Sequence, residues 1–183
     1  MTDGEDRTLL AEIAQRDRVA FETFFAAHGA AVHRFVRDLV HDGGLAEELT
    51  SDVMVQVWRS AAKFAGRSRV RTWLFGIAHH KAIDALRRRR VPTVPLDAML
   101  SIASDAEGPD DAALRAEDRD RLAAALASLS PEHRAVLELT FVEGFSQKEI
   151  ADIVGAPAAT VKTRAFYAKA RLRDVLAAAE QTR

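Results

Sequence analysis

The sequence predicts an all-α protein in which two small helical domains are joined by a flexible acidic linker. Three observations support this prediction. Apolar residues recur at helical spacing along most of the chain, and no long stretch alternates apolar and polar residues as strands do. Alanine is abundant, and one central segment combines proline, small polar residues and acidic charges. With 183 residues, 48% of them hydrophobic, the chain can bury a core.

The first domain is predicted to cover residues 1–91. Its apolar residues have the spacing of four successive helices. We expect Gly43 and Gly44 to end the second helix, because glycine interrupts helical structure. The expected helices cover Thr8–Ala27, Ala30–His41, Leu45–Ala62 and Val70–Arg90.

The second domain is predicted to cover residues 115–183. Ser130 followed by Pro131 is a typical helix start. Ser146 and Glu149 have the spacing of a capping box, which indicates the start of another helix. The expected helices run from Pro131 to Val142, from Ser146 to Gly155 and from Pro157 to Ala179.

Charge is distributed unevenly along the chain, although the net charge is only −1. Residues 1–91 carry 15 Lys or Arg and 12 Asp or Glu, whereas the linker, residues 92–114, carries five acids and no Lys or Arg. Residues 115–183 carry 11 basic and 10 acidic residues. A near-neutral total therefore does not exclude binding to nucleic acid, because binding depends on local charge.

Composition excludes several classes of site. The chain has no cysteine, so disulfides, Cys-ligated zinc, iron–sulfur clusters and a cysteine nucleophile are excluded. The six histidines lack clear metal-ligand spacing, so we expect no metal and no cofactor. No apolar run reaches the ~20 residues that span a bilayer, and the N-terminus does not resemble a signal peptide. We expect a cytoplasmic protein.

The stretch SQKEIADIVGAPAATVKTRAFYAKARL has the spacing of a helix-turn-helix, whose second helix enters the major groove of DNA. Residues 162–173 contain five basic residues and no acid. Basic side chains contact phosphates, and threonine or tyrosine can add hydrogen bonds. A solvated face of an amphipathic helix remains the alternative.

Basic and aromatic residues are interleaved from Phe64 to Arg90, and the stretch from Lys63 to Arg90 holds nine basic residues and one acid. Such a mixture favours an unpaired nucleic-acid strand, since basic residues follow phosphates and aromatic rings stack on bases. The alternative places Trp73 in the core and leaves the terminal arginines as a solvated helix end. A nuclear signal is a weaker interpretation of the arginine run.

The stretch AEELTSDVMVQVWRSAAKF has the opposite charge. Glu47, Glu48 and Asp52 lie at roughly helical spacing beside apolar residues. This pattern fits a docking face for a basic partner helix, or an ordinary solvated face.

Together these segments resemble bacterial sigma factors of the extracytoplasmic-function (ECF) type. The resemblance extends from about Arg18 to Leu176 and rests on AFETFF, the acidic stretch above, FAGRSRVRTWLFGIAHHKAIDALRRRR, LSPEHRAVLELTFVEGFSQKEIA and GAPAATVKTRAFYAKARLR, in this order. It implies a non-enzymatic protein that binds core RNA polymerase and recognises the −10 and −35 promoter elements. It also implies control by an anti-sigma factor, through which alone the chain would contact a membrane.

The resemblance assigns residues to three sites. Those implied in binding the clamp helices of the largest polymerase subunit are Glu47, Glu48, Leu49, Ser51, Asp52 and Val55. Those implied at the −10 element are Phe64, Arg67, Arg69, Arg71, Thr72, Trp73, His79, His80, Lys81, Asp84, Arg87 and Arg88. Those implied at the −35 element are Thr160, Lys162, Thr163, Arg164, Phe166, Tyr167, Lys169 and Arg171. The polymerase flap is a further implied partner.

The sequence also departs from the family pattern. The pair His79–His80 stands where a polar residue such as asparagine is common, and Tyr167 replaces a usual arginine.

The resemblance also implies that the linker threads toward the RNA exit channel of the polymerase. We expect the two domains to form a compact, autoinhibited arrangement only when a partner is bound.

Other classes of protein remain open from the sequence. A stand-alone helix-turn-helix regulator would explain residues 115–183 but would leave the Phe64–Arg90 segment without a role. A sigma mimic that sequesters an anti-sigma factor would not need a basic recognition helix. An enzyme is disfavoured because there is no glycine-rich phosphate loop and no HExxH motif, and Glu143 and Glu149 are isolated acids in the sequence.

Overall fold

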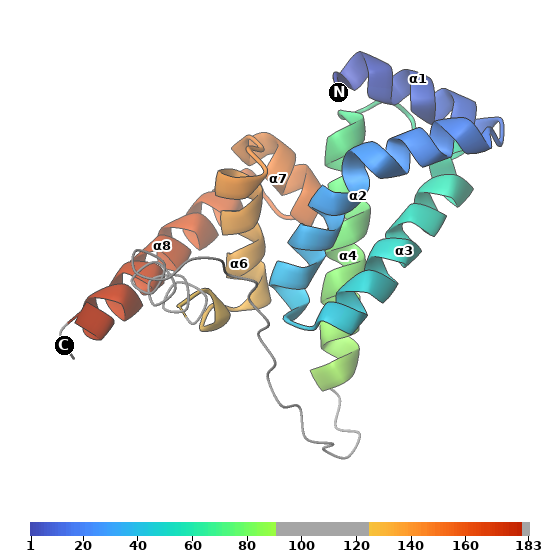
Figure 1. Cartoon of the computed structure of the whole chain (residues 1–183). Helices are drawn as coiled ribbons and strands as arrows, with labels where there is room; N and C mark the ends of the chain where they lie inside the picture. Colours follow the sequence, from blue (N-terminus) through green and yellow to red (C-terminus); the bar gives the residue numbers. More distant parts are fainter. Residues whose placement is uncertain (91–124, 181–183) are drawn as a thin grey trace, which may run out of the picture.

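The computed structural model describes residues 1–90 and 125–180, and every regular element in these residues is helical (Figure 1). This confirms the predicted all-α fold. The elements of the first domain are α1 (Asp3–Ala14), α2 (Arg18–Val40), α3 (Gly43–Ser60), the 3₁₀ turn η1 (Ala61–Lys63) and α4 (Val70–Arg90). Those of the second are α6 (Pro131–Leu137), the π-helical η2 (Glu138–Val142), α7 (Gln147–Val154) and α8 (Ala158–Glu180). The predicted linker, residues 92–114, lies outside the described residues.

The first domain is a bundle of α2, α3 and α4, with α1 packed across one end (Figure 1). Its largest fully buried side chains include Phe24 and Phe35 from α2, Met54 from α3, and Leu74 and Phe75 from α4. Burying such side chains removes apolar surface from water, which is the main force that holds the bundle together. Part of the surface of α4 lies outside this bundle and contacts α7 of the second domain.

The first break between helices lies at a different place from the predicted one. The sequence predicts one helix over Thr8–Ala27, but residues 15–17 separate α1 from α2. Arg16 adopts a left-handed conformation with φ 70°, and the Asp17 side chain accepts hydrogen bonds from two N–H groups in the first turn of α2. This N-cap satisfies groups that a helix start otherwise leaves unpaired.

Helix α2 continues through Gly29, between the two helices that the sequence predicts. A Cβ atom at Gly29 would lie only 3.2 Å from the ring of Phe25, so the glycine lets this ring fold back along the helix. Likewise, Gly43 and Gly44 begin α3 instead of ending α2. The helix boundary is set just before them: His41 is left-handed with φ 53°, and the Asp42 side chain caps α3.

The second domain begins as the sequence predicts. Ser130 caps α6, with Pro131 in its first turn, and the capping box of Ser146 and Glu149 opens α7. Gly155 ends α7 in a left-handed conformation with φ 64°. The predicted helix to Val142 is confirmed, although its last five residues form the π-helical η2.

The two domains pack against each other within one chain, with α7 against α4 and α6 against α2 (Figure 1). Phe75 of α4 and Phe145, Ile150 and Ile153 of the second domain belong to one hydrophobic cluster. The rings of Phe75 and Phe145 meet edge to face, with their centroids 5.1 Å apart. The expectation that a compact arrangement needs a bound partner is therefore wrong for this structure, because complementary apolar faces already hold the domains together.

Candidate nucleic-acid interface

Helices α7 and α8 form a helix-turn-helix. The left-handed Gly155 turns the chain between them, and Ile150, Ile153 and Val161 are buried in the same cluster. This packing leaves one face of α8 free to enter a groove of DNA. Of the predicted −35 residues, six are exposed and two half-buried. The exposed residues are Lys162, Thr163, Phe166, Tyr167, Lys169 and Arg171, and the half-buried ones are Thr160 and Arg164.

Aromatic rings interrupt the basic surface of α8. Phe166 and Tyr167 are 68% and 60% exposed, and their ring centroids lie 5.7 Å apart. The Nζ atom of Lys169 lies 4.7 Å from the ring centroid of Phe141, a cation–π contact between α8 and η2. Cationic and aromatic groups therefore share this face.

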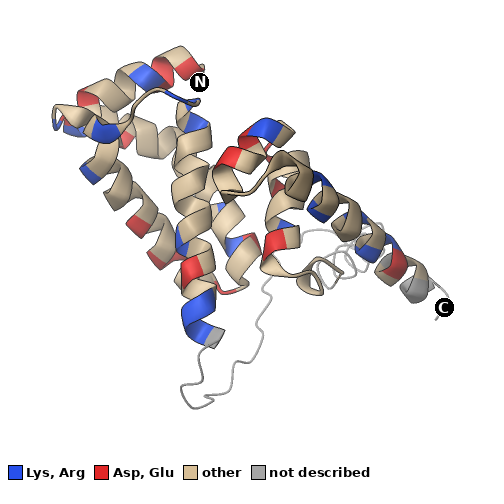
Figure 2. Cartoon of the chain, turned by 180° about the vertical axis from the view of Figure 1, so that it is seen from behind, with Lys and Arg blue, Asp and Glu red and all other residues tan. Residues whose placement is uncertain are grey.

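The predicted −10 residues differ in accessibility, because α4 uses one face for packing. Thr72 and His79 are buried, at 2% and 6% exposure. The half-buried residues are Phe64, Arg71, Trp73 and Lys81. The exposed residues are Arg67, Arg69, His80, Asp84, Arg87 and Arg88. Lys and Arg positions gather near the C-terminal end of α4 (Figure 2).

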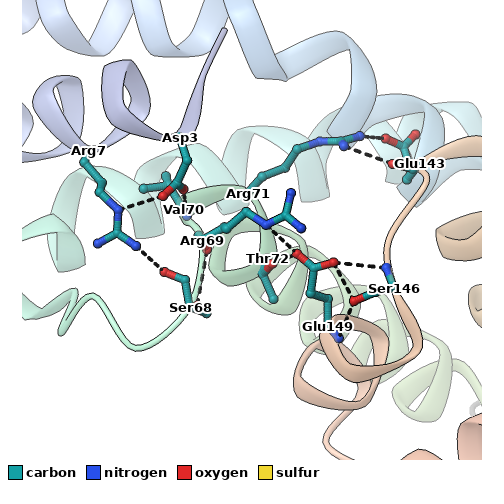
Figure 3. A network of polar contacts seen from close by, with 10 residues as sticks. All are labelled: Asp3, Arg7, Ser68, Arg69, Val70, Arg71, Thr72, Glu143, Ser146 and Glu149. Atoms are coloured by element: carbon teal, nitrogen blue, oxygen red, sulfur yellow. Dashed lines mark hydrogen bonds and ion pairs between the residues drawn. The ribbon is translucent and has the colours of Figure 1, made fainter.

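The second domain covers part of this face through Glu143, which is 5% exposed. Its carboxylate pairs with the guanidinium of Arg71, and Arg71 also donates to the Glu143 carbonyl oxygen at 2.9 Å (Figure 3). The same guanidinium lies 4.8 Å from the ring centroid of Phe145. A predicted DNA-contacting arginine is thus engaged by charge, hydrogen bonding and an aromatic ring from the second domain.

A second acid, Glu149, makes comparable contacts. Arg69 Nε lies 2.8 Å from its carboxylate, and the Thr72 hydroxyl donates to it at 3.2 Å (Figure 3). Glu149 also accepts from the Ser146 N–H as part of the capping box. Burial acts to raise the pKa of Glu149, but hydrogen bonds from the Ser146 hydroxyl and N–H, the charge of Arg69 and the Thr72 hydroxyl together hold this pKa below its usual value.

His79 occupies the same interface without polar contacts. Neither of its ring nitrogens has a hydrogen-bond partner among the described residues. Burial lowers the pKa of His79 to about 4, assisted by the charges of His80, Arg87 and the second domain's Arg164 and opposed by Glu132. His79 therefore stays neutral. In the arrangement seen here, with the two domains packed together (the closed arrangement), His79 is not accessible to a ligand. The neighbouring His80 is exposed, and its Nδ1–H donates to the Gly76 carbonyl at 2.6 Å.

Comparison with known families matches residues 24–91 to Sigma-70 region 2 and residues 119–172 to Sigma-70, region 4. The ECF RNA polymerase sigma factor RpoE of Cereibacter sphaeroides is 35% identical over 180 residues, which cover 95% of this chain and 98% of the relative. The chain belongs to the ECF sigma factor family. The ECF sigma factor SigK of Mycolicibacterium vanbaalenii is 32% identical over 167 residues, 90% of this chain and 85% of that protein.

Two solved structures of similar proteins have the same fold. CnrH, in complex with the cytosolic domain of CnrY, matches with a TM-score of 0.71 at 29% identity, covering 95% of this chain and 98% of CnrH. The sigma factor RpoE from Bartonella quintana, in complex with the anti-sigma factor NepR, matches with a TM-score of 0.70 at 25% identity. That match covers 85% of this chain and 96% of RpoE.

The predicted polymerase-binding residues of this sigma factor lie on α3. Five are exposed along one side of the helix: Glu47, Glu48, Ser51, Asp52 and Val55. Leu49 lies instead in the core, at 7% exposure. Lys81 of α4 pairs with Asp52 at 3.1 Å, so the predicted polymerase and −10 surfaces of the sigma factor adjoin.

An open groove of about 500 Å³ runs beside this pair, between α3, α4 and α7 of the sigma factor. Its lining residues are Gln56, Ser68, Thr72, Trp73, Gly76, Ile77, His80, Lys81, Asp84 and Asp152. Five of them are predicted −10 residues, so the groove brings together side chains that the sequence places up to twelve positions apart.

The helices of the described residues include none with the length and hydrophobicity that a membrane-spanning segment requires.

Sequence reasoning missed two arginines of this sigma factor. Arg34 of α2 pairs with Glu143 at 2.5 Å, and this hydrogen bond raises its pKa. Arg134 of α6 is buried and donates to five backbone carbonyls, including those of Asp38 and Leu39 at the end of α2. It thereby pairs carbonyls that a helix end leaves unsatisfied. Neither arginine belongs to a basic run, so no sequence signal marked them.

Proposed function

We propose that this ECF sigma factor binds core RNA polymerase and directs promoter-specific initiation, with residues 1–91 serving the −10 element and the polymerase, and residues 115–183 the −35 element. The observation that carries the proposal is the pairing of a helix-turn-helix, α7–α8, with a basic and aromatic α4 in a chain that matches both sigma regions in order. A non-enzymatic, cytoplasmic role follows from this function.

Control by an anti-sigma factor is part of the proposal. CnrH and the Bartonella RpoE, both similar to this chain over most of its length, were solved in complex with CnrY and with the anti-sigma factor NepR. The exposed acidic side of α3 and the basic surface of α8 offer such a partner two faces of opposite charge.

Binding to a promoter would require the two domains to separate. Arg69, Arg71 and Thr72 are engaged by the second domain, and His79 is buried within reach of the charges of Glu132 and Arg164 from that domain. Core polymerase would hold the domains apart at the spacing of the two promoter elements, and linkage of the two weak contacts would supply affinity. Free sigma factor would therefore bind promoter DNA weakly.

The proposal is tested by adding the purified protein to core RNA polymerase and mapping run-off transcripts from a pool of genomic fragments, with core alone as the control. Start sites that share two spaced upstream elements would support it. Binding to core without specific initiation would favour the sigma mimic, and tight promoter binding without core would favour a stand-alone regulator.

The α3 face provides a residue-level prediction. Reversing charge in the double variant Glu47→Lys/Glu48→Lys should weaken binding to core polymerase about tenfold or more, because like charges would face a basic partner helix. The affinity is measured by titrating labelled sigma factor with core. The matched control, Glu12→Lys/Glu22→Lys, makes the same charge change at exposed acids of α1 and α2. Equal losses in both double variants would contradict the assignment of α3.

A further inference from the structure

Helix α1 lies outside the residues that match sigma region 2, yet it is firmly joined to that domain. A capping box between Thr2 and Glu5 fixes its first turn. Asp6 and His28 are both buried, and His28 Nε2 lies 2.8 Å from the Asp6 carboxylate, which ties α1 to α2. Leu10 and Ile13 enter the hydrophobic core. The position of α1 is therefore defined by polar and apolar contacts.

From this position α1 reaches the loop of residues 64–69 and the start of α4. The Asp3 carboxylate accepts a hydrogen bond from the Val70 N–H at 2.9 Å and so caps α4 (Figure 3). Arg7 donates to the Ser68 carbonyl at 2.8 Å and to the Asp3 carboxylate at 2.7 Å (Figure 3). A cap that a separate helix provides fixes where the loop ends and α4 begins.

One further contact joins Arg7 to the loop, and the side chain also passes close to Gly66. Its guanidinium lies 5.5 Å from the ring centroid of Phe64. Gly66 adopts φ 68°, and a Cβ atom there would lie 3.1 Å from Arg7 Nη1. The Phe64 ring in turn packs at 5.4 Å from the ring of Trp73 on α4. Two side chains of α1 thus contact the loop at Phe64 and Ser68 and cap α4 at Val70.

We propose that Asp3 and Arg7 are positioning residues that set the conformation of the 64–69 loop, so that α1 determines base selectivity at the −10 element without contacting DNA. This inference rests on the proposed function, in which residues 1–91 serve the −10 element, and on the presence of the predicted −10 residues Phe64, Arg67 and Arg69 in this loop. A site that discriminates between bases must be held in place by its surroundings, because small displacements weaken its contacts. Asp3 and Arg7 supply such support to the 64–69 loop through their contacts with Val70, Ser68 and Phe64.

The functional test compares holoenzymes that contain wild-type, Asp3→Ala, Arg7→Ala or Glu12→Ala sigma factor. Templates are a promoter identified by run-off transcription and its single-base variants in the −10 and −35 elements. For Asp3→Ala and Arg7→Ala, the preference for the best −10 base should fall about five- to tenfold, while −35 preference and affinity for core stay unchanged. Glu12→Ala, which removes an exposed acid of the same helix, should retain both preferences. Asp3→Asn should rescue selectivity in part, because asparagine also caps helices.

Hydrogen exchange of the free protein tests the positioning itself, independently of transcription. The Val70 amide and those of residues 66–69 should exchange about tenfold faster in Asp3→Ala than in wild type or Glu12→Ala. If wild type initiates nowhere, the proposed function fails while this result can still stand. Unchanged exchange, or faster exchange with unchanged −10 preference, would overturn the inference.

Discussion

A Glu143→Gln substitution is expected to raise the open-to-closed ratio of the two domains about 30-fold. Its carboxylate bridges Arg34 of α2 and Arg71 of α4 from an almost fully buried position. The amide carries no charge, so charge-assisted hydrogen bonds become weaker neutral ones and two arginines lose their shared counter-charge. The arginine side chains are 45% and 39% exposed, so solvent screens part of the effect. We therefore expect the substitution to reduce the free energy that favours the closed arrangement by about 2 kcal/mol, which corresponds to the 30-fold change.

The absence of native cysteine makes this prediction accessible to single-molecule energy transfer. Dyes at Glu12→Cys in α1 and Ala177→Cys in α8 would report the separation of the domains from exposed positions. Asp174→Asn, which removes an exposed acid from the same domain, serves as the matched control. The free Glu143→Gln protein should also bind promoter DNA more tightly than wild type. An identical closed fraction in the variant and wild type would show that Glu143 does not hold the domains together.

Acidification from pH 7 to pH 5 is expected to destabilise the closed arrangement of the two domains by about 2 kcal/mol, because His79 becomes protonated more easily when the domains separate. Its pKa is about 4 in the closed arrangement, and an exposed His79 in the open one would recover the ordinary value of 6.5. The open state therefore binds a proton first as the pH falls. The stability that neutral His79 gives the closed state is fully present above pH 6.5 and is lost as the pH falls toward 4.

A His79→Leu substitution should remove most of this pH dependence. At pH 7 it should also favour the closed arrangement by about 1 kcal/mol, because it replaces a buried group whose nitrogens are unpaired among the described residues. The same energy-transfer pair, titrated between pH 7 and pH 5, measures both effects. His33→Gln, which changes a half-buried histidine of α2, is the control. If the His79→Leu protein opens on acidification as wild type does, another group is responsible.

Local signals in the sequence predicted much of the fold. The bounds of α4 were predicted correctly, and Ser130, Pro131 and the Ser146–Glu149 capping box begin helices as expected. Gly155 ends α7 as predicted, but the helix ends expected near Gly29 and at Gly43–Gly44 were wrong. Gly29 lies inside α2, while the real break is made by the Asp17 cap. Glycine permits a break, but side-chain capping and the packing of a ring such as Phe25 decide whether one forms.

The arrangement of the candidate site was beyond local signals. Glu143 and Glu149 looked like isolated acids, yet they bind Arg71 and Arg69 across 72 and 80 positions of sequence. Periodicity reports which side of a helix is apolar, but it does not report which other helix will cover that side. For the same reason, neither the burial of His79 nor the support of the 64–69 loop by α1 could be deduced.

The hydrophobic cluster that joins Phe75 to Phe145, Ile150 and Ile153 makes the stability of the contact between the two domains depend on temperature. Separating the domains exposes apolar surface, so opening carries a positive heat-capacity change. Hydrophobic attraction weakens on cooling, and the closed arrangement should weaken with it. A cooled cell would then hold a larger share of this sigma factor ready for polymerase, with no change in its amount.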